Sequence, residues 1–378
     1  MINMLHSSIG YHTFNMVKRY AIEDGKKILD DFKEYNEKNK CFKIYPTDAS
    51  KTCYRADYLD KHVGIDYWQF RFFNSAKDFK KFILEAKINP KILSGEVDYV
   101  RAATQEHLPI AENRFNEEAR KISRRLGNFS SFKPNRIDFC VNLDLLELKL
   151  PCTDEQMMEL LSRGHIPPHY VEYKTYDPVA HRMKAPDNSF YLKSKSVNIN
   201  CYGKHNQLEE NYPDNPSLED SLAVIRVEVQ YKYLKLYNLV AALEGSGVPS
   251  YSMNQYLFSD DLSKEIVEKY YNRIFFGGDY YTLKEATDRI RARNFRGDKE
   301  RRLIDTLNDV SCYRGVHNAE LHLLGSPSTR RAFKQAISEL VEENINPVTI
   351  PRDWGIPFIP NPLQAYFKLV DSQQDVAV

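Results

Sequence analysis

The sequence predicts an α+β protein in which an antiparallel sheet is flanked by helices and followed by a helical C-terminal domain. Two observations predict this class. Segments that alternate apolar and polar residues recur through the first part of the 378-residue chain, and helical periodicity dominates after it. Between them, EGSGVPS (244–250) gathers the small and turn-forming residues of a linker. We therefore expect two domains, 1–245 and 246–378.

The first 110 residues are expected to form mainly strands with one helix. The segments 66–73 and 80–90 alternate and are rich in aromatic and branched residues, which is typical of strands. The segment 21–39 has a helical pattern, which we expect to be broken near Gly25 because glycine is a poor helix former.

Helical and strand patterns then alternate as far as the linker. Residues 111–130 repeat apolar side chains every three or four positions, which predicts an amphipathic helix. Thr153 is a suitable N-cap for a helix over 153–164, with Gln156 at the capping-box position. The predicted strands are 135–145, 189–194, 196–204 and 222–232, and the predicted helices beyond the linker are 259–276, 282–294, 298–315 and 326–344.

Composition excludes several classes of function. The formal net charge is +1, so no overall field attracts nucleic acid or membranes, and a polyanion site must come from local clusters. Apolar runs fall short of the ~20 residues of a membrane helix, and no signal-peptide pattern is visible. Six scattered cysteines without a CxxC pair indicate reduced thiols rather than a zinc site. A cytoplasmic protein without membrane contact is expected.

Three predicted strands carry polar residues along one face. Successive side chains of a strand point to opposite faces, so every second residue shares a side. If the three strands are neighbours, their polar faces form one surface. The polar faces comprise Arg136, Asp138, Cys140 and Asn142 in the first strand, Asn198, Asn200, Tyr202 and Lys204 in the second, and Arg226, Glu228 and Gln230 in the third. The strand at 80–88 is expected to add Glu85.

Such a surface has a chemical interpretation and a structural one. Carboxylates on adjacent strands hold hard cations such as Mg2+ or Mn2+, and a metal can promote displacement at a phosphodiester. A tyrosine beside it can attack phosphorus, and the ammonium of Lys204 would favour the phenolate of Tyr202. Alternatively, the surface is a solvated face with weak ion pairs. On physical grounds alone both interpretations stay open.

Other catalytic motifs are missing from the sequence. GxxxxGK[ST], GxSxG and HExxH do not occur. His165 and His169 are separated by two prolines, which indicates a loop rather than paired metal ligands on a helix. A His-hydrophobe-His triplet, used by many metal-dependent nicking nucleases, is also missing.

The order of several segments resembles the filamentous-phage gene II/X replication initiators. The similar segments are 85–95, 135–142, 198–209, 225–239 and 312–347, whereas 150–190 and the C-terminal tail show no match. The resemblance implies rolling-circle replication, in which the initiator nicks one strand of a circular duplex through a tyrosine, becomes joined to the 5′-phosphate and later recloses the displaced strand.

The resemblance also implies roles for single residues. Tyr202 matches the nucleophile and Lys204 the accompanying lysine. Asp138 and Glu228 match the acidic positions of the flanking motifs, and Glu85 matches an acid of the N-terminal motif. Chemistry assigns these three carboxylates to a metal, Mg2+ or Mn2+. Residues 1–245 would then be the nicking and closing domain.

The implied partners are origin duplex and single-stranded DNA, with a host helicase and polymerase. Arginine-rich stretches at 120–125 and 289–302 suit phosphate contacts. The predicted DNA-binding residues are Arg136, Arg226, Arg291, Arg293 and Arg296. Two alternatives remain: a non-catalytic origin-binding regulator, and a relaxase-type mobilisation protein of a mobile element.

Overall fold

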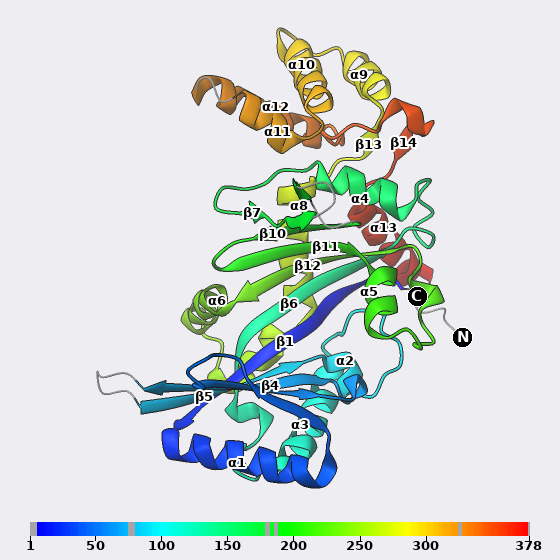
Figure 1. The fold of residues 1–378 in the computed structure, drawn as a ribbon. Coiled ribbons are helices and arrows are strands. Elements are labelled where there is room, and N and C mark those ends of the chain that lie inside the picture. The colour runs from blue at the N-terminus through cyan, green and yellow to red at the C-terminus, as the bar shows by residue number, and fades with distance from the viewer. Residues whose placement is uncertain (1–5, 75–79, 178–181, 185–187, 324–326, 377–378) are drawn as a thin grey trace.

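A ten-stranded antiparallel sheet forms the centre of the molecule (Figure 1). The computed structural model describes residues 6–74, 80–177, 182–184, 188–323 and 327–376. Every strand pair of the sheet is antiparallel, which confirms the predicted class. In spatial order the strands are β2 (Phe42–Pro46), β3 (Cys53–Tyr58), β4 (Ile65–Asn74), β5 (Lys80–Ile88), β1 (Ser8–Ala21), β6 (Lys133–Asp144), β12 (Val224–Lys232), β11 (Val197–Gly203), β10 (Ser189–Lys193) and β7 (Val171–Glu172).

Helices flank this sheet, and two small two-stranded sheets lie outside it. The small sheets pair β8 (Thr175–Asp177) with β9 (Arg182–Lys184) and β13 (Tyr280–Tyr281) with β14 (Phe358–Ile359). The helices are α1 (Ile22–Asn39), α2 (Pro90–Leu93), α3 (His107–Ile122), α4 (Asp154–Ser162), α5 (Lys204–Asn211), α6 (Tyr233–Gly245), α7 (Met253–Leu257), α8 (Asp260–Phe275), α9 (Leu283–Ala292), α10 (Lys299–Cys312), α11 (Val316–His322), α12 (Pro327–Glu342) and α13 (Pro362–Val376). The capping box predicted for α4 is confirmed, with Thr153 and Gln156 bonding each other's backbone N–H.

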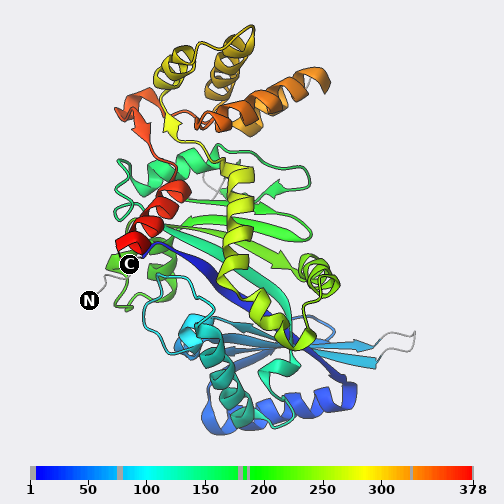
Figure 2. The ribbon, with the colours of Figure 1, turned by 180° about the vertical axis from the view of Figure 1, so that it is seen from behind.

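The apolar face of the sheet is covered by helices from both halves of the chain. Phe32 of α1 and Phe115 of α3 pack on Trp68 of β4, and Tyr270 of α8 packs on Tyr231 of β12. Figure 2, which views the molecule from behind, shows α8 in yellow-green crossing in front of the central strands. These residues belong to one hydrophobic core, so the sheet's other face is left to polar side chains.

A second, smaller core lies among α9, α10 and α12, away from the central strands (Figure 1). It contains Ile290, Leu303, Leu307 and Leu340. The predicted boundary after residue 245 stays a prediction. The cores do not separate at that point, because α8 follows it and packs on the sheet.

Two local predictions are wrong. The first helix is not broken near Gly25, because α1 is continuous from Ile22 to Asn39. Gly25 is buried, and a Cβ at this position would collide with the ring of Phe82 in β5, so glycine allows the helix to approach the sheet. The second of the three polar strands ends at Gly203 rather than at Lys204, which is the first residue of α5.

Candidate active site

The polar face of the central strands carries a buried network of charged side chains. Strands β1, β6, β12 and β11 lie side by side, as the predicted common surface requires. A β-bulge in β1 is part of it. Tyr11 pairs with Phe139 and Phe14 with Ile137, so both His12 and Thr13 lie opposite Asp138. Their side chains consequently both reach the polar face, where His12 bonds Glu228 and Thr13 bonds Asp138.

Glu228 is the centre of this network. Its Oε1 accepts a hydrogen bond from the hydroxyl of Tyr202 at 2.6 Å and lies 2.8 Å from Nδ1 of His12. Its Oε2 accepts from the amide of Asn200 at 3.2 Å. Side chains of β1 and β11 therefore converge on one carboxylate of β12, which is 3% exposed.

The surroundings fix the protonation states of these groups. Burial, and then the positive charge of Arg226, lowers the pKa of His12 to about 4, so its imidazole is neutral at pH 7. Burial raises the pKa of Glu228, but the interactions with His12 and Arg226 outweigh it and hold the pKa below its usual value. Burial and the negative charge of Glu228 raise the pKa of Tyr202 well above 10. The resting site thus holds a neutral phenol beside a carboxylate.

Lys204 does not have the environment that the sequence predicts. It is buried at the start of α5, and its Nζ donates to Gln207 at 2.5 Å. Burial, and then Arg226, lowers its own pKa well below 10.5. The expected lowering of the Tyr202 pKa by a neighbouring ammonium is not found, since that pKa is raised. A direct role for Lys204 in catalysis stays a prediction.

The three predicted metal ligands lie in separate groups of contacts. Asp138 is bound by both the Nε (2.8 Å) and the Nη2 (2.5 Å) of Arg136 and by Thr13 at 2.5 Å. Glu85 bonds Arg71 at 2.5 Å and Asn15 at 2.7 Å. Within the part of the chain that the structure describes, no three His, Cys, Asp or Glu side chains are arranged to hold a metal ion. The predicted ligand set therefore does not fit one shared Mg2+ or Mn2+ ion.

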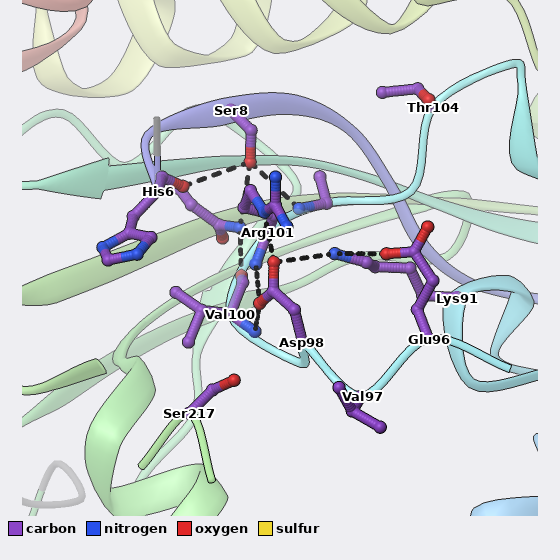
Figure 3. A network of polar contacts seen from close by, with 12 residues as sticks. His6, Ser8, Lys91, Glu96, Val97, Asp98, Val100, Arg101, Thr104 and Ser217 are labelled. Carbon is purple, nitrogen blue, oxygen red and sulfur yellow. Dashed lines mark hydrogen bonds and ion pairs between the residues drawn. The ribbon is translucent and has the colours of Figure 1, made fainter. Parts of the chain in front are cut away.

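Arg226 is buried rather than available to DNA. It is 1% exposed, and its guanidinium donates to Asn142 at 2.6 Å and to the carbonyl of Val100 at 2.9 Å. The segment around Val100 is held in place by Asp98, which accepts from Lys91 and from the backbone of Val100 (Figure 3). The prediction that Arg226 contacts DNA does not fit this burial; the residue instead connects the site to the 98–101 segment.

The other predicted DNA-binding arginines lie in two places. Arg136 is half-buried on the polar face and pairs with Asp138. Arg291, Arg293 and Arg296 are exposed at the end of α9 and in the loop after it, and Arg293 pairs with Glu343. These three belong to the smaller helical unit and not to the network around Glu228.

His12 is the site residue that sequence reasoning missed. A strict alternation through YHTFN would put either His12 or Thr13 on the apolar face, and only the bulge lets both reach the polar one. The two consecutive polar residues between the apolar residues Tyr11 and Phe14 were the available signal. Of the two neighbouring tyrosines, Tyr191 lies opposite Asn200 on β10, whereas Tyr231 is buried on the apolar face.

Comparison with known proteins gives a distant likeness. No family model matches the chain, and no curated protein matches it. One similar solved structure is a rolling circle replication initiator protein from Geobacillus stearothermophilus, at 9% identity over 71% of this chain and 85% of that chain, with a TM-score of 0.33. A likeness of this size does not assign the chemistry, which must be argued from the side chains. Among the described helices, none is long and apolar enough to cross a bilayer.

Proposed function

We propose that this protein nicks and recloses one strand of DNA through Tyr202, as a rolling-circle replication initiator does. The observation that carries the proposal is the sharing of Glu228 Oε1 by the hydroxyl of Tyr202 and the imidazole of His12. A phenol with a raised pKa is a poor nucleophile unless a base removes its proton during attack. Glu228 is in hydrogen-bond contact with that proton.

The reaction is a transesterification that needs no outside energy source. The phenolic oxygen of Tyr202 bonds to phosphorus while the bond from phosphorus to the 3′-oxygen breaks. The phenolic proton passes to Glu228, and a proton is returned to the leaving 3′-oxygen, giving a free 3′-hydroxyl and a 5′-phosphotyrosine. Attack by a 3′-hydroxyl on the phosphotyrosine reverses these steps and closes the strand.

The neighbours of Glu228 position it for this role. His12 in its neutral form donates from Nδ1 to Oε1, and Asn200 donates to Oε2, so the carboxylate is held with one oxygen toward Tyr202. The side chain of His12 is 21% exposed, whereas Tyr202 is 9% exposed and Glu228 is 3% exposed. A phosphate would therefore approach from the His12 side of the polar face, and the network must open for Tyr202 to attack it.

Dependence on Mg2+ or Mn2+ stays a separate prediction. When bound, such an ion would supply positive charge to the phosphate. The carboxylates of Asp138 and Glu85 are already neutralised by Arg136 and Arg71, so we assign the cation no ligands from them. Host helicase and polymerase as partners likewise remain proposals from the resemblance.

One observation favours a second candidate, a DNA-binding regulator without catalysis. Tyr202 is buried, and its hydroxyl is satisfied by Glu228, as in a purely structural polar network. A relaxase-type mobilisation protein would use the same chemistry as the first candidate and differ only in the DNA element that it serves.

A nicking assay separates the two candidates. The protein is incubated with supercoiled DNA that carries its own coding region and flanks, with Mg2+, with Mn2+ or with EDTA. The proposal predicts open circles and a protein–DNA band that survives boiling in detergent. Binding without any open circle or covalent band under all three conditions would favour the regulator.

A further inference from the structure

Aromatic and cationic side chains are paired on the outer face of β2–β5. Lys43 lies 5.6 Å from the ring centroid of Tyr45, Arg55 lies 3.9 Å from that of Tyr67, and Lys81 lies 5.8 Å from that of Phe73. Among the described side chains, each aromatic ring that points outward from these strands thus has a cation beside it. Phe73 is 40% exposed and the tyrosines are half-buried.

The strand register places these rings on the face opposite the helices. Trp68 and Phe70 of β4 point to α1, so the alternate residues Tyr67 and Phe73 point away from it. The pairing of Tyr45 with Arg55 puts the β2 ring on the same side. The face is therefore an open platform and not part of the hydrophobic core.

Positive charge predominates on this platform. Its outward cations are Lys43, Arg55, Arg71, Lys81 and Lys87. Three carboxylates partner them: Asp57 bonds Arg55, Glu85 bonds Arg71, and Asp66 bonds Lys87 at 2.6 Å. A chain of net charge +1 thus concentrates an excess of cations where its outward rings also gather.

We propose that the outer face of β2–β5 binds single-stranded DNA. Unpaired bases stack on aromatic rings and on guanidinium planes, whereas lysines and arginines contact the phosphates between them. The Arg55–Tyr67 stack offers a planar surface of this kind, and Tyr45 and Phe73 offer two more. Duplex DNA hides its base faces, so the platform distinguishes single strands from duplex by stacking.

The platform adjoins the network around Glu228. Asn15 of β1 donates to Glu85 at 2.7 Å and to the hydroxyl of Tyr67 at 3.4 Å, three residues after His12. A strand lying on the platform would therefore lead toward Tyr202. That the DNA strand leads toward Tyr202 rests on the proposed nicking function. The binding of single-stranded DNA to the platform does not depend on it.

Binding of fluorescein-labelled dT16 to the full-length protein, followed by fluorescence anisotropy, tests the platform. Replacing both Tyr67 and Phe73 with Ala should weaken binding by about 5- to 100-fold for each lost base stack. Tyr67→Phe keeps the ring and should bind as the wild type does. Tyr251→Ala removes a ring that is 91% exposed elsewhere and is the matched control, with no expected loss.

Two results would overturn the platform. The first is a double variant that binds dT16 as tightly as the wild type does, while its circular dichroism spectrum shows that it is folded. The other is an equal loss of affinity for a 16-base-pair duplex, because stacking on paired bases cannot occur. Tyr202→Phe should still bind dT16. If the nicking proposal fails, the binding result therefore stands, and if the platform does not bind dT16, the nicking proposal is unaffected.

Discussion

The phenol of Tyr202 and the carboxylate of Glu228 meet diagonally across two neighbouring antiparallel strands, with 2.6 Å between hydroxyl and Oε1. In the ladder, Tyr202 stands directly opposite Arg226, and Glu228 stands opposite Asn200. A diagonal pair of this kind depends on register, because a slip of one residue would turn one of the two to the apolar face. The buried faces of β11 and β12 fix that register and hence the contact.

Glu228 and Asp138 should differ in their importance for nicking. Glu228→Gln keeps the shape and removes the base, so nicking should fall about 10²- to 10⁴-fold. Asp138→Asn weakens the pair with Arg136 and should mainly lower the free energy of unfolding, by about 1–3 kcal/mol, with less than a tenfold loss of nicking. Rates on a single-stranded substrate and urea unfolding measure the two effects.

The same pair of variants tests the predicted metal. If Asp138 and Glu228 were ligands of one ion, both variants would lose nicking to a similar extent, and both would need higher Mg2+ concentrations. Equal losses would therefore contradict our assignment of Glu228 as the base.

The pH dependence of stability should report His12. Its pKa is about 4 in the folded protein and near 6.5 when unfolded, so the unfolded chain binds a proton first as the pH falls. The stabilisation from neutral His12 is complete above about pH 6.5 and is lost as the pH falls toward 4, on the order of 3 kcal/mol. Urea unfolding of the wild type and of His12→Asn between pH 7.5 and 4.5 measures it. If the free energy of unfolding depends on pH in the same way in both proteins, the pKa of His12 is not lowered in the folded state.

The arginines at the end of α9 and in the loop after it are expected to contact duplex DNA. Replacing Arg291, Arg293 and Arg296 with Ala should weaken duplex binding and reduce the slope of log K against log salt by up to about 3. Cleavage of single-stranded DNA should remain. Lys26, Lys33 and Lys38 of α1 are exposed and paired with acids, so their triple Ala variant is the control for lost charge. If duplex binding by both triple variants shows the same slope of log K against log salt, the arginines do not contact DNA and form an ordinary solvated surface.

Gly25→Ala should destabilise the protein, although alanine favours helices. An exposed mid-helix glycine would gain about 1 kcal/mol from this change. Here the new Cβ would overlap the ring of Phe82, and overpacking costs about 1–3 kcal/mol. The free energy of unfolding should therefore fall, by up to about 2 kcal/mol. A gain of 1 kcal/mol would mean that α1 can move away from β5.

Periodicity was sufficient for the class of the fold and for the polar and apolar faces of β6, β11 and β12. The positions of Tyr202, Asp138 and Glu228 on one polar surface follow from alternation alone. The contacts within that surface do not follow, because they depend on spatial strand order and on irregularities. The bulge at His12 breaks the alternation of β1, and it supplies a partner of Glu228.

Burial was the second property that the pattern could not provide. The strand pattern predicts that Lys204 and Arg226 are cations that face solvent or DNA. In the structure both are buried, Lys204 in the first turn of α5 and Arg226 against the 98–101 segment. The 98–101 segment is distant in sequence from Arg226, which it covers. Lys204 lies just beyond the end of β11, in the first turn of α5. The docking of both segments depends on tertiary contacts such as those of Asp98, which local periodicity does not encode.

The covalent adduct on Tyr202 tests the central claim most directly. A single-stranded origin fragment is incubated with the wild type, with Tyr202→Phe and with Tyr191→Phe, and the DNA-linked tryptic peptide is identified by mass spectrometry. Our account predicts a phosphotyrosine at Tyr202 in the wild type and in Tyr191→Phe, and no adduct in a folded Tyr202→Phe protein. An adduct on another tyrosine, or an unchanged yield from Tyr202→Phe, would contradict it.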